Sequence, residues 1–142
     1  GLHGLTKNKI EGDKKTPIGI YSLGNLFYRK DRLGIINTKL KKKIISKSMG
    51  WCDDIKSSKY NKLIRISKKK VKHEKMYRND KKYDLLIPIK YNMIKPIRNK
   101  GSAIFIHLTE NYKPTAGCIA LKKNDFLILL KLINKKTKIK II

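Results

Sequence analysis

Short apolar runs separated by turn residues recur along the chain and predict a mainly β protein. The strongest strand pattern covers residues 103–108, Ala-Ile-Phe-Ile-His-Leu. Successive side chains of a strand point to opposite faces, so His107 should share a face with Ala103 and Phe105. The aliphatic residues at 104, 106 and 108 should then take the other face.

Five further strands are predicted, at residues 20–23, 63–66, 83–91, 118–121 and 137–141. Pro88 inside the third of these cannot donate to a ladder, which favours an edge position or a bulge. Residues 11–19 are typical of an ordered loop, and residues 50–54 of a turn that carries Trp51. Residues 29–48 give no clear prediction.

One helix is predicted near the C-terminus, from about Asp125 to Ile133. Asn124 is the expected N-cap, and Asp125 would favour the helix dipole. The nearly all-apolar helix sequence predicts that it is buried. The length of 142 residues fits one domain, 1–142. The predicted fold class is therefore mainly β with one clear C-terminal helix.

The charge balance is unusual, with 36 basic and 10 acidic residues and a formal net charge of +26. Basic surfaces can bind nucleic acid, but here most basic residues are Lys, which recognises phosphate and guanine less specifically than Arg. The Lys residues are also scattered, with short runs only at 41–43 and 68–70. We therefore expect a solvated basic surface and no nucleic-acid partner.

The ends and apolar runs of the chain bear on its location. The longest apolar run, Phe126 to Leu130, is far shorter than the ~18 residues that a membrane span needs. Gly1 is preceded by neither Met nor an apolar leader, so we expect an upstream segment to have been removed and an export signal to lie outside this chain.

Cys118 and His107 are the residues best suited to chemistry. Cys118 follows Gly117 at the start of one predicted strand, and His107 closes the preceding strand, so the intervening loop should bring the two side chains together. A nearby imidazole can take the proton of a nucleophilic thiol, and the Gly117 N–H could approach an oxyanion. The alternative is a small buried Cys beside a core His. The chain lacks CxxC, HExxH and GxGxxG spacings, so neither metal nor cofactor is expected.

The residues around this pair resemble the L,D-transpeptidase catalytic domain family, which is YkuD-like. The resemblance rests on Gly101-Ser102-Ala103-Ile104-Phe105-Ile106-His107 followed by Pro114-Thr115-Ala116-Gly117-Cys118-Ile119-Ala120-Leu121. Supporting matches are Glu11-Gly12-Asp13 with Thr16-Pro17-x-Gly19, Gly50-Trp51-Cys52-Asp53-Asp54, Tyr60-Asn61, His73-Glu74, Tyr83-Asp84 and Tyr91-Asn92. These segments occur in the family's order over nearly the whole chain.

The resemblance implies a β-sandwich or barrel that transfers acyl groups on peptidoglycan stem peptides. Cys118 would be the nucleophile, His107 the general base and then acid, and backbone N–H groups at Gly117 and Cys118 the oxyanion hole. Thr115 would shape the loop or contact substrate, and Ala116, Ser102 and Trp51 are further candidate substrate contacts. No cofactor or metal is implied.

Two positions depart from the family pattern. Many members have Arg two residues after the nucleophile, where this chain has Ala120, and Gly after the His, where it has Leu108. These differences leave open which residue holds the substrate carboxylate, with one of the Lys residues or Arg98 as candidates.

Several residues keep two interpretations. Trp51 could be a packing anchor or a sugar platform. Cys52 could lie near the cleft, be a buried hydrophobe or form a disulfide with Cys118 that would block the nucleophile. His73 and Glu74 could orient the imidazole or be structural, and the sequence favours structure.

Three functions remain open at this stage. The first is an L,D-transpeptidase that forms cross-links, and the second an L,D-carboxypeptidase or endopeptidase that gives the same thioester to water. The third is a non-catalytic polyanion-binding module. We expect a bacterial periplasmic or cell-envelope monomer, with electrostatic association to the anionic envelope.

Overall fold

A computed structural model of the chain describes residues 1–67 and 71–142. Its largest sheet has five strands in the order β11-β10-β9-β4-β5. The strands are β4 (Leu26–Tyr28), β5 (Lys42–Ile44), β9 (Leu85–Pro88), β10 (Phe105–Leu108) and β11 (Ile119–Leu121). The β10 and β11 pair is parallel, whereas β9 runs antiparallel to both of its neighbours.

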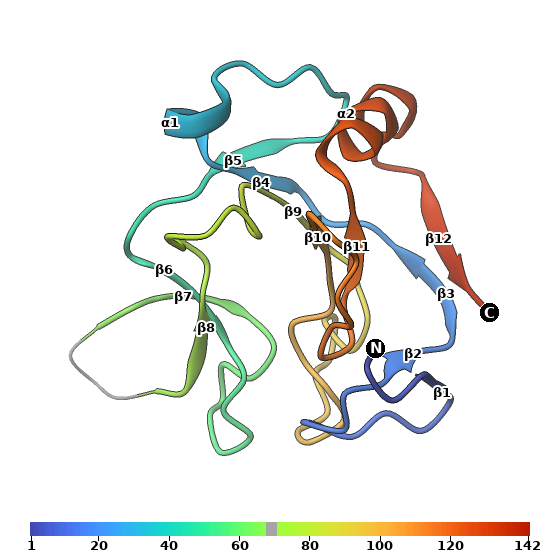
Figure 1. Cartoon of the computed structure of the whole chain (residues 1–142). Coiled ribbons are helices and arrows are strands. Elements are labelled where there is room, and N and C mark those ends of the chain that lie inside the picture. The colour runs from blue at the N-terminus through green and yellow to red at the C-terminus, as the bar shows by residue number, and fades with distance from the viewer. Residues whose placement is uncertain (68–70) are drawn as a thin grey trace.

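A second sheet of three strands packs against one face of the first, giving a sandwich. Its order is β7-β6-β8, with β6 (Met49–Cys52), β7 (Leu63–Arg65) and β8 (His73–Lys75). Phe27, Leu86 and Phe105 of the large sheet form a buried cluster with Trp51 of β6. Figure 1 shows this smaller sheet on one side of the large one.

The other face of the large sheet is covered by α2 (Lys123–Leu132), whose Phe126 and Leu130 are buried in a second core cluster (Figure 1). Two pairs of strands complete the fold: β3 (Gly19–Ser22) with β12 (Lys138–Ile141), and β1 (Leu5–Thr6) with β2 (Thr16–Pro17). A four-residue helix, α1 (Lys30–Leu33), follows β4. The predicted mainly β fold with a C-terminal helix is confirmed.

Most predicted strands are present, with shorter bounds. The edge position predicted for Pro88 is wrong, because β9 lies in the middle of its sheet. The bulge alternative fits, since the pairing with the β4 side shifts by one residue around Pro88, from Phe27 opposite Leu86 to Leu23 opposite Ile89. Pro88 is the last residue of β9, where its missing N–H interrupts little of the ladder. The loop at residues 11–19 contains β2 and the start of β3, and the unassigned residues 29–48 contain α1 and β5. The Lys run at 68–70 lies outside the described residues.

The turn predicted at residues 50–54 is wrong, because Met49–Cys52 forms the central strand β6. Gly50 fits there because β8 comes close: a Cβ added at Gly50 would lie 2.9 Å from Cδ2 of His73. A glycine that looks like a turn residue in the sequence therefore permits a tight contact between two strands.

The helix begins earlier than predicted. Its N-cap is Lys122, without a side-chain cap, and Asn124 lies inside the first turn. The predicted burial of the whole helix is also wrong, since Ile128 and Leu132 are exposed. The helix packs only one stripe on the sheet, which is enough to close the core. No helix in the described part of the chain has the length and apolar character of a membrane span.

Candidate active site

Cys118 immediately precedes β11 and faces the core between the two sheets. Its thiol donates to the Ala103 carbonyl oxygen at 3.2 Å, and its Sγ accepts the Phe105 N–H at 3.4 Å. Ala103 has a φ of 53°, so the chain bends there just before β10 begins. Burial raises the pKa of the Cys118 thiol to about 11, so the thiol is protonated at neutral pH.

His107 lies on β10 and is 1% exposed. Its Nδ1 lies 2.9 Å from the Leu108 carbonyl oxygen, and because a carbonyl only accepts, Nδ1 must carry the proton. Nε2 is buried and has no hydrogen-bond partner. Burial lowers the pKa of His107 to about 4. The imidazole is therefore neutral, with a free acceptor at Nε2.

The parallel register brings the two residues to one face. It sets His107 opposite Ala120 and Ile106 opposite Ile119, which continues to Phe105 opposite Cys118. Residues two apart on a strand share a face, so Cys118 and His107 occupy the same side of the sheet. Both line one cavity of about 170 Å³. The predicted division of β10 is confirmed as well: Phe105 lies in the cluster between the sheets, and the aliphatic residues at 104, 106 and 108 lie in the cluster under α2.

The loop before Cys118 is braced by Thr115. Its Oγ1 donates to the Cys118 carbonyl oxygen at 2.6 Å and accepts the Gly117 N–H at 3.2 Å. Gly117 has a φ of 135°, and a Cβ there would lie 2.7 Å from the Lys15 carbonyl oxygen. Only glycine fits this backbone and this contact. The Gly117 N–H, a candidate oxyanion donor, is thus held by Thr115 in this state.

Ser102 lines the same cavity, as do Thr115 and Ala116. The Ser102 hydroxyl donates at 2.7 Å to Oε2 of Glu11, which also accepts from Tyr60. Ser102 is therefore engaged in holding a carboxylate that itself lines the cavity.

Trp51 is 3% exposed and packs edge-on against Phe105, with ring centroids 5.2 Å apart. Its Nε1–H donates to Oδ1 of Asn61 at 2.9 Å, and the same oxygen accepts the Ala103 N–H at 3.0 Å. Trp51 does not line the cavity of Cys118 and His107. The geometry corresponds to the packing anchor.

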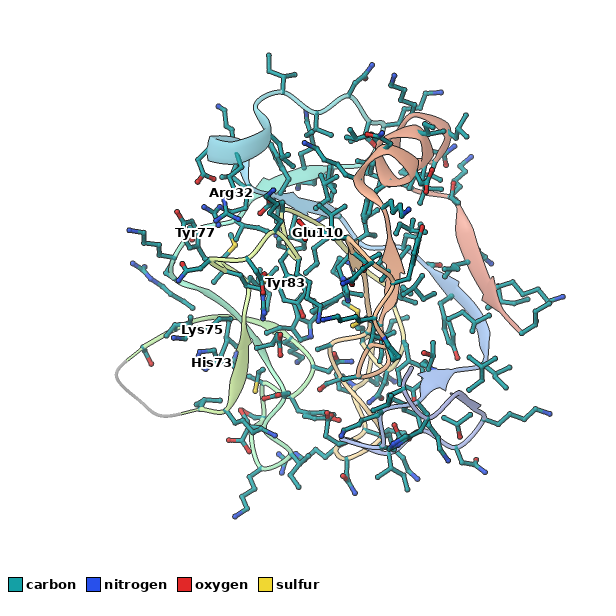
Figure 2. The ribbon with its side chains drawn as sticks, viewed as in Figure 1. Arg32, His73, Lys75, Tyr77, Tyr83 and Glu110 are labelled. Carbon is teal, nitrogen blue, oxygen red and sulfur yellow. The ribbon has the colours of Figure 1, made fainter. Side chains whose placement is uncertain are left out.

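The sequence did not place Asp53 or Lys82 at the site, and it favoured a structural role for His73 and Glu74. Glu74 of β8, Asp53 and Lys82 line the cavity of Cys118, whereas His73 does not. The Tyr83 hydroxyl donates to Glu74 at 2.8 Å, and its ring lies 5.6 Å from the His107 ring. Figure 2 shows Tyr83 near the middle of the molecule, inward from His73 and Lys75 on β8. The alternation of β8 was the available signal, since it sends Glu74 to the opposite face from His73 and Lys75.

A larger cavity of about 510 Å³ adjoins the first, and Lys82, His107 and Thr115 line both. Ala120 lies in this larger cavity, opposite His107. Arg98 lines a different pocket with Tyr60 and Pro96. Among the described lysines, Lys82 lines both cavities, whereas Lys9 lines only the smaller one and Lys81 and Lys113 only the larger one.

The two cysteines are both free, and Cys52 is fully buried in β6. The disulfide alternative therefore does not occur in this structure. Within residues 1–67 and 71–142, no group of three or more His, Cys, Asp or Glu is arranged to hold a metal ion.

Comparison with known proteins gives one match. The model of a protein family described as the L,D-transpeptidase catalytic domain, YkuD, matches residues 2–141. Searches of curated proteins and of solved structures gave no match.

Proposed function

Because the chain belongs to the YkuD family of L,D-transpeptidase catalytic domains, we propose that it is a cysteine acyltransferase acting on peptidoglycan stem peptides. The observation that carries this proposal is the neutral pair of Cys118 and His107 in one cavity, with the His107 Nε2 free to accept a proton. The proposal treats residues 1–142 as one catalytic domain that acts as a monomer.

In the first half-reaction, Nε2 of His107 takes the thiol proton as Sγ of Cys118 attacks the carbonyl at the L-centre of the stem's diamino acid. The amide C–N bond then breaks, and the terminal D-Ala leaves as an amine that takes the proton from His107. A thioester remains on Cys118. The raised thiol pKa means that proton transfer and attack are coupled, without a resting thiolate.

In the second half-reaction, an amine of a neighbouring stem attacks the thioester. Its proton passes to His107 and then to the departing Cys118 thiolate, which leaves a new amide cross-link. The backbone N–H groups of Gly117 and Cys118 would stabilise the oxyanion of each step. Thr115 holds the Gly117 N–H until substrate arrives and keeps the loop in shape.

Lys82 is our candidate for holding the substrate carboxylate. It lines both cavities next to His107, while the family's usual Arg position is occupied by Ala120. An ammonium is a point charge without the fork of a guanidinium, so this contact would be less directional than that of an Arg.

A hydrolase is the close alternative, because an L,D-carboxypeptidase or endopeptidase would form the same thioester and pass it to water. Incubation with disaccharide-tetrapeptide separates the two by product mass: cross-linked dimers mean transfer, and tripeptide alone means hydrolysis. The non-catalytic polyanion-binding module predicts that Cys118→Ala changes no activity.

The decisive experiment is covalent trapping of Cys118 by a carbapenem. We expect a mass increase of one adduct in the wild type and in Cys52→Ala, and none in Cys118→Ala. His107→Gln should slow adduct formation by about a hundredfold or more, the scale of general base catalysis. A folded, reduced wild type that gives neither adduct nor turnover would overturn the enzymatic proposal.

We further propose a bacterial periplasmic or cell-envelope location, where the net charge of +26 holds the protein against the anionic envelope. Binding to isolated cell walls should then weaken as salt rises, whereas acylation of Cys118 should depend on salt far less. Wall binding that is insensitive to salt would contradict the electrostatic part of this proposal.

A further inference from the structure

Three carboxylates line the small cavity of Cys118, although the chain as a whole is strongly basic. Glu11, Asp53 and Glu74 are three of only 10 acidic residues, in a chain with 36 basic ones. They come from separate segments: the loop after β1, the residue after β6, and β8. The fold therefore gathers scarce negative charge at the nucleophile.

This negative charge is poorly compensated. Oε2 of Glu11 accepts from two neutral hydroxyls, those of Tyr60 and Ser102. Oδ1 of Asp53 is buried without a hydrogen-bond partner, and its Oδ2 lies 4.0 Å from Lys72, whose side chain is 71% exposed.

Glu74 has the closest basic partner of the three. It accepts from the Tyr83 hydroxyl and lies 3.4 Å from Arg78. That guanidinium makes its shorter ion pair, at 2.6 Å, with Asp80. Glu74 therefore keeps part of its charge available to the cavity.

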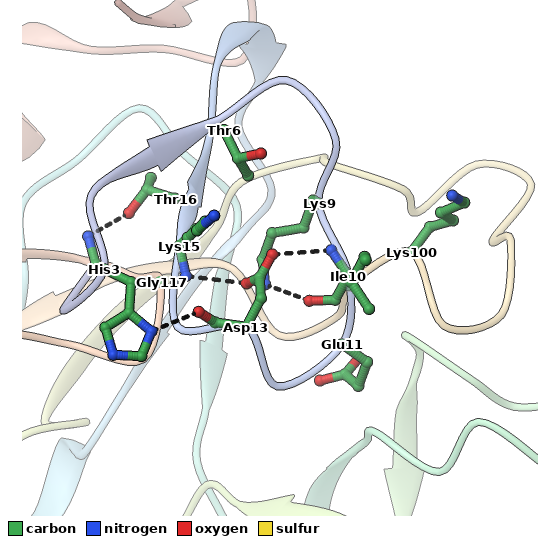
Figure 3. Close-up of polar contacts among 12 residues, drawn as sticks. His3, Thr6, Lys9, Ile10, Glu11, Asp13, Lys15, Thr16, Lys100 and Gly117 are labelled. Atoms are coloured by element: carbon green, nitrogen blue, oxygen red, sulfur yellow. Dashed lines mark hydrogen bonds and ion pairs between the residues drawn. The ribbon is translucent and has the colours of Figure 1, made fainter.

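The two lysines that line the cavity do not offset all of this charge. Lys9 is buried, and its Nζ pairs with Asp13 and donates to the Ile10 carbonyl oxygen at 2.9 Å. Figure 3 shows the Asp13 side chain joining Lys9, Ile10 and Lys15 within the N-terminal loop. Asp13 does not line the cavity, so it neutralises Lys9 from outside. Of the two lysines that line the cavity, Lys82 is the one without an ion pair among the described residues.

The cavity also contains hydrogen-bond acceptors without donors. His107 is 1% exposed and its Nε2 is unpartnered, and Oδ1 of Asp53 is a second such acceptor. A ligand with a positive charge and several N–H donors would satisfy these acceptors and balance the carboxylates. A primary ammonium has one positive charge and three donors. A metal ion fits less well, because the described residues contain no metal-binding group.

We propose that Glu11, Asp53 and Glu74 form a subsite for a primary ammonium group of the substrate. This inference rests on the proposed function, which supplies two sources of that group: the free amine on the diamino acid of the donor stem, or the attacking amine of the acceptor stem. In either case the carboxylates hold the ammonium beside Cys118, and Lys82 can meet an accompanying carboxylate. An acceptor ammonium gives one proton to a carboxylate of the subsite before the neutral amine attacks the thioester.

The first test measures binding without chemistry. Calorimetry on Cys118→Ala compares a stem tetrapeptide whose diamino acid has a free side-chain amine with the same peptide N-acetylated there. We expect the free amine to bind at least about tenfold more tightly, the scale of a charge-assisted hydrogen bond. Equal affinities, or no binding of either peptide, would overturn the subsite, and this comparison needs no change to the carboxylates.

A second comparison links the preference to these residues. Adding Asp53→Asn and Glu74→Gln should reduce the preference for the free amine to less than about twofold. Asp125→Asn, an exposed residue in the first turn of α2, is the matched control and should leave it unchanged. A preference that survives the double substitution would also overturn the proposal.

Product analysis with Cys118 intact then identifies the source of the ammonium. If the acceptor supplies it, the double variant should shift products from amide to hydrolysis by about tenfold. If the donor supplies it, acylation should weaken and the product ratio should stay constant. If the double variant changes neither the product ratio nor acylation, the subsite is contradicted. Carbapenem trapping, run in parallel, tests the proposed function separately. A protein that is not acylated would contradict the proposed function, and the calorimetric comparison of the two peptides would still test the subsite.

Discussion

The Nδ1–H of His107 donates to the carbonyl oxygen of Leu108, the next residue in the chain, at 2.9 Å. This bond fixes the tautomer and leaves Nε2 as a free acceptor in a residue that lines the same cavity as Cys118. The orienting partner is thus a backbone carbonyl, so no side chain is needed to hold the imidazole. The resting site is an uncharged thiol and imidazole pair.

The reactivity of Cys118 should therefore rise steeply with pH. With a pKa of about 11, roughly one thiol in ten thousand is ionised at pH 7. Alkylation by iodoacetamide in a Cys52→Ala background should accelerate about tenfold per pH unit up to about pH 11. A rate that levels off near neutral pH would indicate a thiolate–imidazolium ion pair of Cys118 and His107 instead.

The depressed pKa of His107 should make the fold sensitive to acid. An unfolded imidazole takes up its proton near pH 6.5, but the folded one does so only near pH 4. Between these values the unfolded chain binds more protons, so stability is lost as pH falls through this window, by about 2–3 kcal/mol. Urea denaturation at pH 7 and at pH 4.5 measures this, and His107→Gln should lose that much less than the wild type. If both proteins lose the same free energy of unfolding, the acid sensitivity does not come from the lowered pKa of His107.

Gly117→Ala should disable the catalytic loop. The new Cβ would meet the Lys15 carbonyl oxygen at 2.7 Å in a backbone conformation that L residues rarely adopt. We expect carbapenem acylation to slow by about a hundredfold, because the displaced loop misplaces Cys118. Gly34→Ala is the control: it has a φ of 64°, no atom within 4 Å of the added Cβ, and lies away from the site. Similar acylation rates in the two variants would contradict the steric explanation.

Asn61→Ala should be among the most destabilising single changes. Asn61 is 2% exposed, bonds Trp51 and Ala103 through Oδ1, and donates from Nδ2 to two backbone carbonyls. Removing it leaves these buried groups unsatisfied, at a cost of about 3 kcal/mol in the free energy of unfolding. Denaturant titration should show less than about 0.5 kcal/mol for the exposed Asn37→Ala. A small effect at Asn61 would show that water replaces these bonds.

Lys82→Gln tests the proposed substrate carboxylate contact. We expect KM for the tetrapeptide to rise about tenfold with a smaller change in kcat, because a charge contact made in both the ground state and the transition state affects binding. Steady-state product assays measure it, with Lys131→Gln on α2 as a control of equal charge change. An unchanged KM would exclude Lys82 from this role.

The strand pattern and the Cys and His pair could be predicted from sequence because both are local signals. The alternation at residues 103–108 gives the faces of β10 directly, and Gly117 next to Cys118 marks a close backbone approach. The turn expected around Gly50 failed because its glycine serves the contact with β8, which depends on tertiary packing.

The electrostatics of the site could not be predicted in the same way. Glu11, Asp53 and Glu74 are far apart in the sequence. The pairing of β6 with β8 brings Asp53 and Glu74 near each other, and the N-terminal loop adds Glu11 to the same cavity. Their proximity to Cys118 depends on the three-dimensional arrangement, as does the choice of Lys82 among many lysines.

The pairing of β3 with β12 joins segments that are far apart in the sequence, with Gly19 opposite Ile141. Such nonlocal contacts require large loops to close before they contribute energy, which places folding in the slow class of β proteins. The edge of β3 therefore stays unpaired until residues 138–141 have been synthesised and have folded back onto it.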